Sequence, residues 1–308
     1  MRGRVVIDYL VYLAVRIAVC IAQAMDIDSA ARLAKGFAWF VADVLRFRGD
    51  VVDDNLRHAF PEYSERQQRE LTRRMWEHLL LLAVEVTHAS RRIHETNWRD
   101  FVELDGVDRV VRLLMSDRPT VIVTAHYGNF EIGGFLLGLM GYPTFTVARA
   151  LDNRFLNAFV NRFREATGQY IIAKNGEFER ILAVMAGGGT MSFLADQHAG
   201  PKGCWVDFFG RTASAHKAIA LLSLQHDAPV AVCGVRRLDR PLHFSMEVID
   251  VADPRDAADD AGSAQSLTQW YTSRLEAMIR RAPEQYWWVH RRWKQPPPRR
   301  AKAAKRAA

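Results

Sequence analysis

Hydrophobic residues follow a helical period in the first third of the chain and form strand-like runs after it. They recur at helical spacing from Ser29 to Arg46 and from about Ser64 to Arg92, and the sequence Ser64 to Gln67 fits a helix-capping box. After Asn97, short apolar runs alternate with stretches of helical period. These runs are FVEL, TVIVTA, TFTVAR, YIIA, TMSFLAD and PVAVCGV. HFSMEVID then alternates as a strand does, and Gln265 to Arg281 is predicted to be a final helix.

Such alternation is typical of βαβ units around a parallel sheet. We therefore predict an α/β fold, a mainly parallel sheet with flanking helices, preceded by a helical region that extends to about residue 96. The chain has 308 residues, of which 49% are hydrophobic, and no shift in composition divides it. We expect a single domain over residues 25–295, followed by a basic disordered tail over residues 296–308.

The formal net charge of +7 comes from the end of the chain, because the stretch from Arg291 to Arg306 contains eight Lys or Arg and no acid. Such a tail could bind anionic lipid, nucleic acid or an acidic protein, or could simply be solvated. No zinc knuckle, aromatic RNA-binding signature or helix-turn-helix pattern accompanies it, so we expect no nucleic-acid partner. Three scattered cysteines without a CxxC pair indicate a reducing compartment.

The N-terminal segment MRGRVVIDYLVYLAVRIAVCIAQAMD has three interpretations: a cleaved signal peptide, a membrane anchor or interfacial helix, and a buried amphipathic helix. Charge within the apolar stretch argues against a signal peptide. We favour an anchor or interfacial helix over residues 1–24, with Arg2 and Arg4 on the cytoplasmic side. Because Asp8 and Arg16 interrupt the stretch, we expect a shallow or re-entrant position rather than a full span.

The segment TAHYGNFEIGG places His126 directly after an apolar run and Glu131 where a helix is expected to begin, near Asn129. In parallel sheets, ligands gather at the carboxyl ends of the strands. A carboxylate in the first helical turn could accept a hydrogen bond from one imidazole nitrogen and leave the other free to take a proton from a hydroxyl. A structural His–Glu pair is the alternative interpretation. Gly128, Gly133 and Gly134 would permit close approach of the backbone.

Five segments together resemble the lipid A biosynthesis branch, the late acyltransferases, of the lysophospholipid acyltransferase superfamily. They are DDNLRHAFPEYSERQQ, HYGNFE, VARALDN, FLADQHAGPKGCWVDFFGRTAS and QYWWVHRRWKQPP. The resemblance covers nearly the whole chain and implies a glycerolipid acyltransferase-like fold. The chain departs from the family where Arg154 follows Asp152-Asn153 in place of proline, and in the residues after His126.

The resemblance implies an O-acyltransferase at the cytoplasmic face of the cell inner membrane. Its donor would be an acyl thioester of acyl carrier protein or coenzyme A, and its acceptor a hydroxyl of a glycolipid, the lipid A precursor. His126 would be the general base, assisted by Glu131, without an acyl-enzyme, which agrees with the absence of a G-x-S-x-G motif from the sequence. The alternatives are another lipid acceptor, such as a lysophospholipid or a mannosylated inositol lipid, and a non-catalytic membrane lipid-binding protein.

Several further residues are candidates for substrate binding. Arg149 would stabilise the oxyanion or bind a phosphate, or would instead pair with Asp152. The other candidates are Asp152, Asn153, Asp196, Gln197, Arg291 and Arg292, with a bracing role equally open for Asp196 and Gln197. Trp287, Trp288 and Trp293 suit a lipid–water boundary or the core. His198, His216 and His226 match no familiar metal-site spacing, so we expect no metal and no cofactor.

Overall fold

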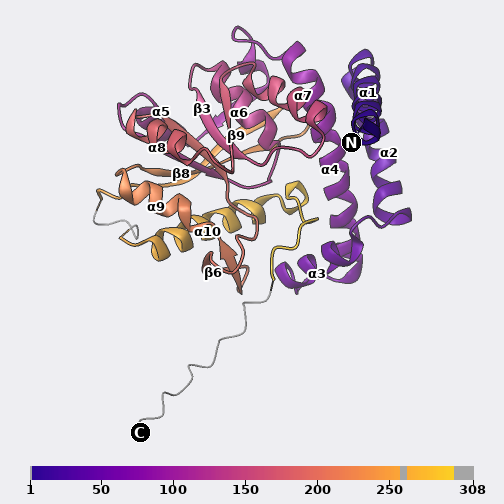
Figure 1. Cartoon of the computed structure of the whole chain (residues 1–308). Coiled ribbons are helices and arrows are strands. Elements are labelled where there is room, and N and C mark those ends of the chain that lie inside the picture. Colours follow the sequence, from indigo (N-terminus) through magenta and orange to yellow (C-terminus); the bar gives the residue numbers. More distant parts are fainter. Residues whose placement is uncertain (1, 257–261, 295–308) are drawn as a thin grey trace.

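The computed structural model describes residues 2–256 and 262–294; the predicted tail over residues 296–308 lies outside them. The first third is helical, as predicted (Figure 1). Its helices are α1 (Arg2–Ala24), α2 (Ile27–Trp39), α3 (Gly49–Ala59) and α4 (Glu65–Arg92). The helix expected over Ser29 to Arg46 ends earlier, in a π-helical turn, η1 (Phe40–Val44). Ser64 and Gln67 form the predicted capping box of α4.

The α/β part contains a seven-stranded sheet in the order β1-β9-β8-β2-β5-β3-β4. Its strands are β1 (Val102–Asp105), β2 (Thr120–Thr124), β3 (Thr144–Ala148), β4 (Gln169–Ala173), β5 (Thr190–Leu194), β8 (Val230–Arg237) and β9 (Phe244–Ala252). Neighbouring strands are parallel except for β8 and β9, which pair antiparallel. The predicted class, a mainly parallel sheet with flanking helices after a helical region, is confirmed.

Helices cover both faces of the sheet. They are α5 (Asp108–Leu114), α6 (Phe130–Leu139), α7 (Arg154–Glu165), α8 (Phe178–Ala186), α9 (Lys217–Gln225) and α10 (Ala264–Arg281). Val121 and Val123 of β2 are fully buried in the core shared with α8, α9 and α10, whereas Ile122, which points the other way, faces α5 and α6. Figure 1 shows α9 and α10 on one side of the sheet and α6 on the other.

A separate hairpin of β6 (Cys204–Phe208) and β7 (Arg211–Ala215) was not expected from the apolar pattern. Its two turn residues, Phe209 and Gly210, both have positive φ, 55° and 73°. Both residues of a type I′ turn require positive φ, and phenylalanine rarely adopts it. The sequence signal for this turn is therefore weak.

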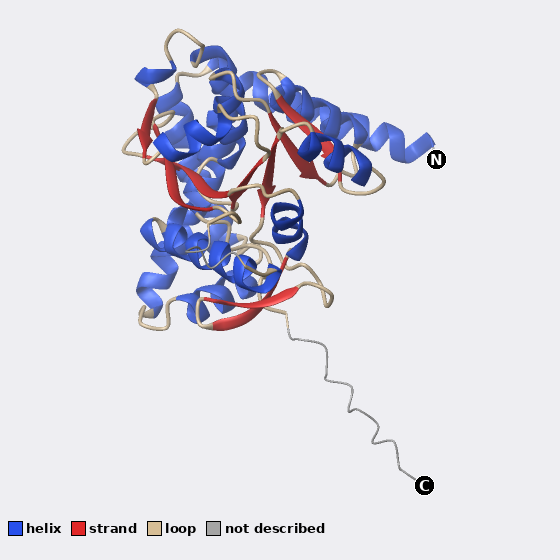
Figure 2. Ribbon diagram, turned by 90° about the vertical axis from the view of Figure 1, so that its left-hand side faces the viewer, coloured by secondary structure: helices blue, strands red, loops and turns tan. Residues whose placement is uncertain are grey.

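Helix α1 lies lengthwise against the side of the body, with its N-terminal end projecting beyond it (Figure 2). The Asn153 amide donates to the Asp8 carbonyl at 2.7 Å, and the Gln23 amide donates to the Thr87 carbonyl at 2.7 Å. The Arg16 guanidinium lies 5.0 Å from the Phe159 ring of α7. One side of α1 is thus fixed to α4 and α7, while most of its apolar side chains face outward.

Candidate active site

His126 and Asp196 come together because β2 and β5 are neighbours in register. Thr124 pairs with Leu194 in this parallel ladder, and His126 and Asp196 each follow two residues later. The Ala195 N–H donates to the Thr124 carbonyl and extends the pairing past the strand ends. The two side chains therefore leave the sheet at the same edge and the same level.

The imidazole of His126 is held in one tautomer. Its Nδ1 lies 2.9 Å from Oδ1 of Asp196, and since a carboxylate only accepts, Nδ1 carries the proton. Nε2 is then the basic nitrogen, and the Gln197 amide nitrogen lies 3.5 Å from it. Burial lowers the pKa of His126, but the charge and hydrogen bond of Asp196 outweigh burial and raise this pKa above 6.5. The His126 charge and hydrogen bond in turn hold the pKa of Asp196 well below its ordinary value, although burial alone would raise it.

Glu131 does not have the hydrogen-bond partner that the sequence suggested. It lies in the first turn of α6, as expected, and the Asn129 side chain caps this helix. Its carboxylate accepts two hydrogen bonds from the Arg164 guanidinium of α7, at 2.9 and 2.5 Å. The expected bond to the imidazole is made by Asp196 instead. Glu131 still acts on His126 through its charge, which raises the pKa of His126, whereas Arg164 lowers it.

A buried polar network supports the loop that carries His126. Gly128 has φ of +56°, and a Cβ at this position would overlap the Val235 carbonyl. The Gly128 carbonyl accepts from Nε2 of His78 at 3.1 Å, and Nδ1 of His78 accepts from Arg237 at 2.7 Å. Arg237 also forms a bidentate pair with Glu85, which in turn accepts from the Asn129 amide.

Three members of this network were not identified from the sequence, because His78 and Glu85 of α4 lie far along the chain from Arg237 of β8. Burial and the Arg237 charge lower the pKa of His78 well below its ordinary value, so His78 is neutral. Its intact Nε2–H is what the Gly128 carbonyl requires.

The segment after α10 closes the other side of the site. The Trp287 N–H donates to the His126 carbonyl, and the Trp287 ring lies 5.1 Å from the imidazole. Nε2 of His290 lies 3.8 Å from Oδ2 of Asp196. Trp288 and Trp293 are buried in the core against Phe208 and Phe209, so the boundary interpretation fails for these two rings.

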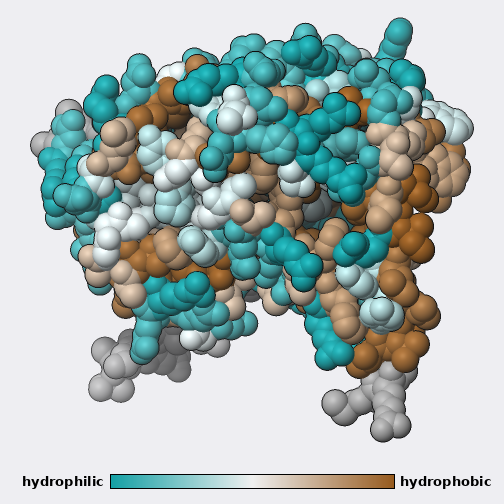
Figure 3. All heavy atoms as spheres, turned by 90° about the horizontal axis from the view of Figure 1, so that it is seen from above, coloured by the Kyte–Doolittle hydropathy of each residue, from teal (hydrophilic) through white to brown (hydrophobic). Residues whose placement is uncertain are grey.

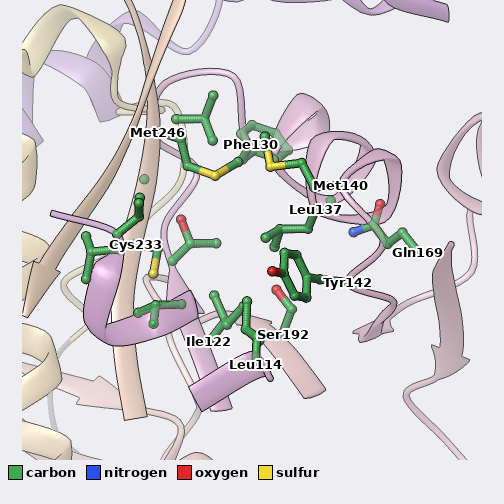
Figure 4. A pocket seen from close by; sticks show the side chains of 18 of the residues that line it. Leu114, Ile122, Phe130, Leu137, Met140, Tyr142, Gln169, Ser192, Cys233 and Met246 are labelled. Atoms are coloured by element: carbon green, nitrogen blue, oxygen red, sulfur yellow. The ribbon is translucent and has the colours of Figure 1, made fainter. Parts of the chain in front are cut away.

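An apolar cavity of about 100 Å³ lies between the sheet and helices α5 and α6 (Figure 4). Its walls include Leu114, Ile122, Phe130, Leu137, Met140, Tyr142, Ser192, Cys233 and Met246. The Phe130 ring also lies 5.0 Å from the imidazole of His126, so this cavity reaches the edge of the sheet that carries His126. Burial raises the pKa of the Cys233 thiol to about 12, and the thiol remains protonated.

A second, polar cavity of about 900 Å³ lies on another side of His126. We call it the basic basin. It is lined by Arg46, Arg48, Gly49, Asp50, Val51, Arg149, Gln197, His198, His290, Arg291 and Lys294. Gln197, beside the His126 imidazole, and His290, beside the Asp196 carboxylate, connect the basin to the His126–Asp196 pair. Five of its side chains are cationic and one is acidic, so the basin favours anions.

The predicted substrate-binding residues divide into those that line the basin and those that do not. Arg149, Gln197 and Arg291 line the basin. Arg149 is 77% exposed and pairs with Asp152 at 2.8 Å, the alternative that the sequence left open. The Asn153 side chain caps α7 and donates to the Asp8 carbonyl.

Arg292 is buried, which does not fit its expected contact with substrate. Its guanidinium donates to the Ser214 carbonyl at 2.6 Å and lies over the Phe208 ring. Arg292 and Trp293 are both buried, whereas Arg291 and Lys294 on either side of them are exposed. Within residues 2–256 and 262–294, no group of His, Cys, Asp and Glu has the arrangement of a metal site.

A sequence model for the family described as bacterial lipid A biosynthesis acyltransferase matches residues 2–295. The chain belongs to this family. The resemblance found in its motifs is thereby confirmed, and the structure shows how some of these motifs contact one another. Asn55 of the segment DDNLRHAFPEYSERQQ, for example, donates to the carbonyls of Trp288 and His290 and so anchors the closing motif.

Curated relatives of this acyltransferase carry names from the same pathway. The lipid A biosynthesis palmitoleoyltransferase of Escherichia coli (strain K12) is 25% identical over 256 residues, 82% of this chain and 81% of the relative. The lipid A biosynthesis lauroyltransferase of the same organism is 22% identical over 272 residues, 86% of this chain and 85% of the relative. A solved structure, the 1-acyl-sn-glycerophosphate (LPA) acyltransferase of Thermotoga maritima, aligns with a TM-score of 0.39 at 13% identity, over 88% of this chain and 100% of its own. The protein is an O-acyltransferase.

Proposed function

We propose that this acyltransferase moves a fatty acyl chain from an acyl thioester, of acyl carrier protein or coenzyme A, to a hydroxyl of a lipid A precursor. His126 is the general base. One observation carries the proposal: Phe130, which lines the apolar cavity, and Gln197, which lines the basic basin, both lie beside the imidazole of His126. The cavity suits a hydrocarbon chain and the basin suits phosphate groups, so the acyl carbon and the acceptor hydroxyl would meet at this nitrogen.

The proposed reaction needs one proton carrier. Nε2 takes the proton of the acceptor hydroxyl as its oxygen attacks the thioester carbonyl. The resulting tetrahedral intermediate collapses with cleavage of the C–S bond, and the thiolate receives the proton from the imidazolium. Asp196 stabilises the imidazolium between the two transfers, as a buried carboxylate bound to Nδ1 does in other histidine-dependent enzymes. Glu131 contributes through its charge, with Arg164 holding it in place.

The tetrahedral oxyanion requires a hydrogen-bond donor in the site. Gln197 is our candidate because its amide nitrogen lies beside Nε2 of His126, where the carbonyl would bind. Arg149 is largely exposed and paired with Asp152, so we assign it to a phosphate of substrate in the basin. Loss of one such donor typically reduces kcat by about 100-fold or more.

We also propose that the enzyme works at the cytoplasmic face of the inner membrane, attached by a retained helix α1. This helix is long and apolar enough to cross a membrane, and Val6, Ile7, Leu10, Ile17 and Ile21 are all exposed on it. The backbone carbonyl of Asp8 and the side chain of Arg16 both contact the body, which suits a helix lying in the interface.

Mass spectrometry of the lipid A fraction after deletion of the gene tests the acceptor. The proposal predicts lipid A species that lack one acyl chain and recover it when the gene is restored. An unchanged acyl pattern contradicts the lipid A assignment. A change in the acylation of lysophospholipid or mannosylated inositol lipid would favour another acceptor. A purified protein that acylates nothing in a total lipid extract would favour the lipid-binding alternative.

A further inference from the structure

Helix α2 and the turn after it carry their large apolar side chains on the outside. The side facing α4 buries small residues, Ala30, Ala34 and Ala38, with Val41 of η1. The opposite side exposes Leu33, Phe37, Phe40 and Val44, which recur at helical spacing. Trp39, Leu45 and Phe47 are also exposed, and these seven residues form what we call the α2 apolar face. Their exposed fractions run from 37% to 62%.

This arrangement is the reverse of a helix on the surface of a soluble protein, where large apolar residues point inward. A contiguous exposed apolar surface of this kind marks an interaction site. Figure 3 shows hydrophobic side chains gathered over the side of the molecule where α1 and α2 lie in Figure 1. The α2 apolar face therefore continues the exposed surface of α1.

Two arginines at the end of this face point to the substrate site. Arg46 and Arg48, on either side of the exposed Phe47, line the basic basin. Both have positive φ, 44° and 55°, in the left-handed region that non-glycine residues seldom adopt. The Arg48 guanidinium donates to the Val289 carbonyl at 2.8 Å, and Arg46 pairs with Asp53 at 3.0 Å. The chain thus turns so that apolar and cationic side chains alternate beside the basin.

We propose that the α2 apolar face inserts into the membrane leaflet and places the opening of the basic basin at the level of the lipid headgroups. This inference rests on the proposed function and adds the route of the acceptor: a lipid keeps its chains in the leaflet while its anionic headgroup enters between Arg46, Arg48, Arg291 and Lys294. Apolar residues bordered by cations match hydrocarbon bordered by anionic headgroups. A second copy of this chain would bring the same cations against each other, so a leaflet fits better.

Nitroxide labels on the full-length protein test the insertion. Phe37→Cys and Leu45→Cys provide labels on the face, and Met115→Cys and Phe178→Cys provide matched controls at the end of α5 and the start of α8. All carry Cys20→Ser, which removes the exposed thiol. With vesicles of phosphatidylethanolamine and phosphatidylglycerol, labels at 37 and 45 should become protected from a water-soluble nickel chelate and accessible to oxygen. The control labels should remain accessible to the chelate.

Unchanged chelate accessibility at positions 37 and 45 overturns the proposal. Protection without vesicles that increases with protein concentration also overturns it, because a second copy would then cover the face. These labels report membrane contact without any activity, so this result is separable from a failure of acyl transfer.

A kinetic arm tests delivery of the acceptor. Phe37→Asp with Leu45→Asp should lower kcat/KM for a vesicle-embedded acceptor by about tenfold. The same variant should retain wild-type activity toward acceptor dispersed in detergent, as should Met115→Asp with Phe178→Asp in both media. Equal losses in vesicles and detergent would show that the face does not deliver the acceptor, and would contradict the route.

Discussion

In the proposed mechanism, the basicity of His126 depends mainly on the buried carboxylate of Asp196. Replacing Asp196 by asparagine removes the charge that stabilises the imidazolium and allows the amide to bind the wrong tautomer. We expect Asp196→Asn to lower kcat by about 10² to 10⁴-fold with little change in KM. Steady-state kinetics with an acyl thioester donor and lipid A precursor measure this loss.

Glu131→Gln is the matched control for that substitution. Its carboxylate contacts Arg164 rather than the imidazole, so we expect a smaller loss of kcat than for Asp196→Asn. The reverse order of effects would assign the orienting role to Glu131 and contradict the pairing of His126 with Asp196 as the catalytic one.

The pH dependence of kcat/KM reports the protonation of His126. Only the neutral imidazole is a base, and the Asp196 carboxylate raises its pKa above 6.5 against the opposing effect of burial. Activity should therefore fall as the pH falls, with an acidic limb above pH 6.5. Asp196→Asn should move this limb to lower pH, because the stabilising charge is gone. An acidic limb below 6.5 in the wild type, or no movement in the variant, would contradict the proposed pairing.

At the scale of elements, helix α4 supports the His126 loop through the buried pair of Glu85 and Arg237. Glu85→Leu leaves the Arg237 guanidinium buried without its partner. We expect the free energy of unfolding to fall by about 3 to 5 kcal/mol, measured by urea denaturation. Glu77→Leu, on the same helix, removes a partly exposed carboxylate whose partner Lys35 is largely exposed, and should change it by less than about 1 kcal/mol. Equal effects would mean that this network does not stabilise the fold.

The second prediction at this scale concerns the apolar cavity and the preferred length of the acyl chain. Ser192 lines the cavity on β5, four residues before Asp196, so it lies about 13 Å along the strand from the catalytic edge. Ser192→Phe should shorten the preferred acyl chain without a large loss of kcat for short donors. Thr212→Phe, on the exposed part of β7, is the control. Competition between donors of different length measures the preference, and an unchanged preference would place the acyl chain elsewhere.

The elements themselves were largely predictable from the sequence, because strands such as TVIVTA and helices such as α4 have strong periodic or capping signals. The position of His126 at a strand end followed from the same pattern. Its carboxylate partner did not, since the choice between Glu131 and Asp196 depends on the pairing of β2 with β5. Strand order is a long-range property, and so is the contact between Glu85 and Arg237.

At the scale of the whole molecule, a salt wash can distinguish membrane attachment by α1 from attachment by the basic end of the chain. Salt of about 1 M reduces the Debye length to about 3 Å and releases proteins held by charge alone. We expect the full-length enzyme to remain with the membrane fraction under these conditions, because the exposed face of α1 is apolar. Sedimentation followed by immunoblotting measures the distribution. Complete release by salt would assign attachment to the basic end instead.

The proposed mechanism places the hydrocarbon chain in the apolar cavity on one side of His126 and anionic groups in the basic basin on another. The most direct test of His126 as the general base is acyl transfer from a radiolabelled thioester to lipid A precursor by purified wild-type and His126→Ala proteins, with thermal unfolding to verify that both are folded. We expect a labelled product for the wild type and a loss of at least about 100-fold for His126→Ala. Equal transfer by the two folded proteins would contradict this role.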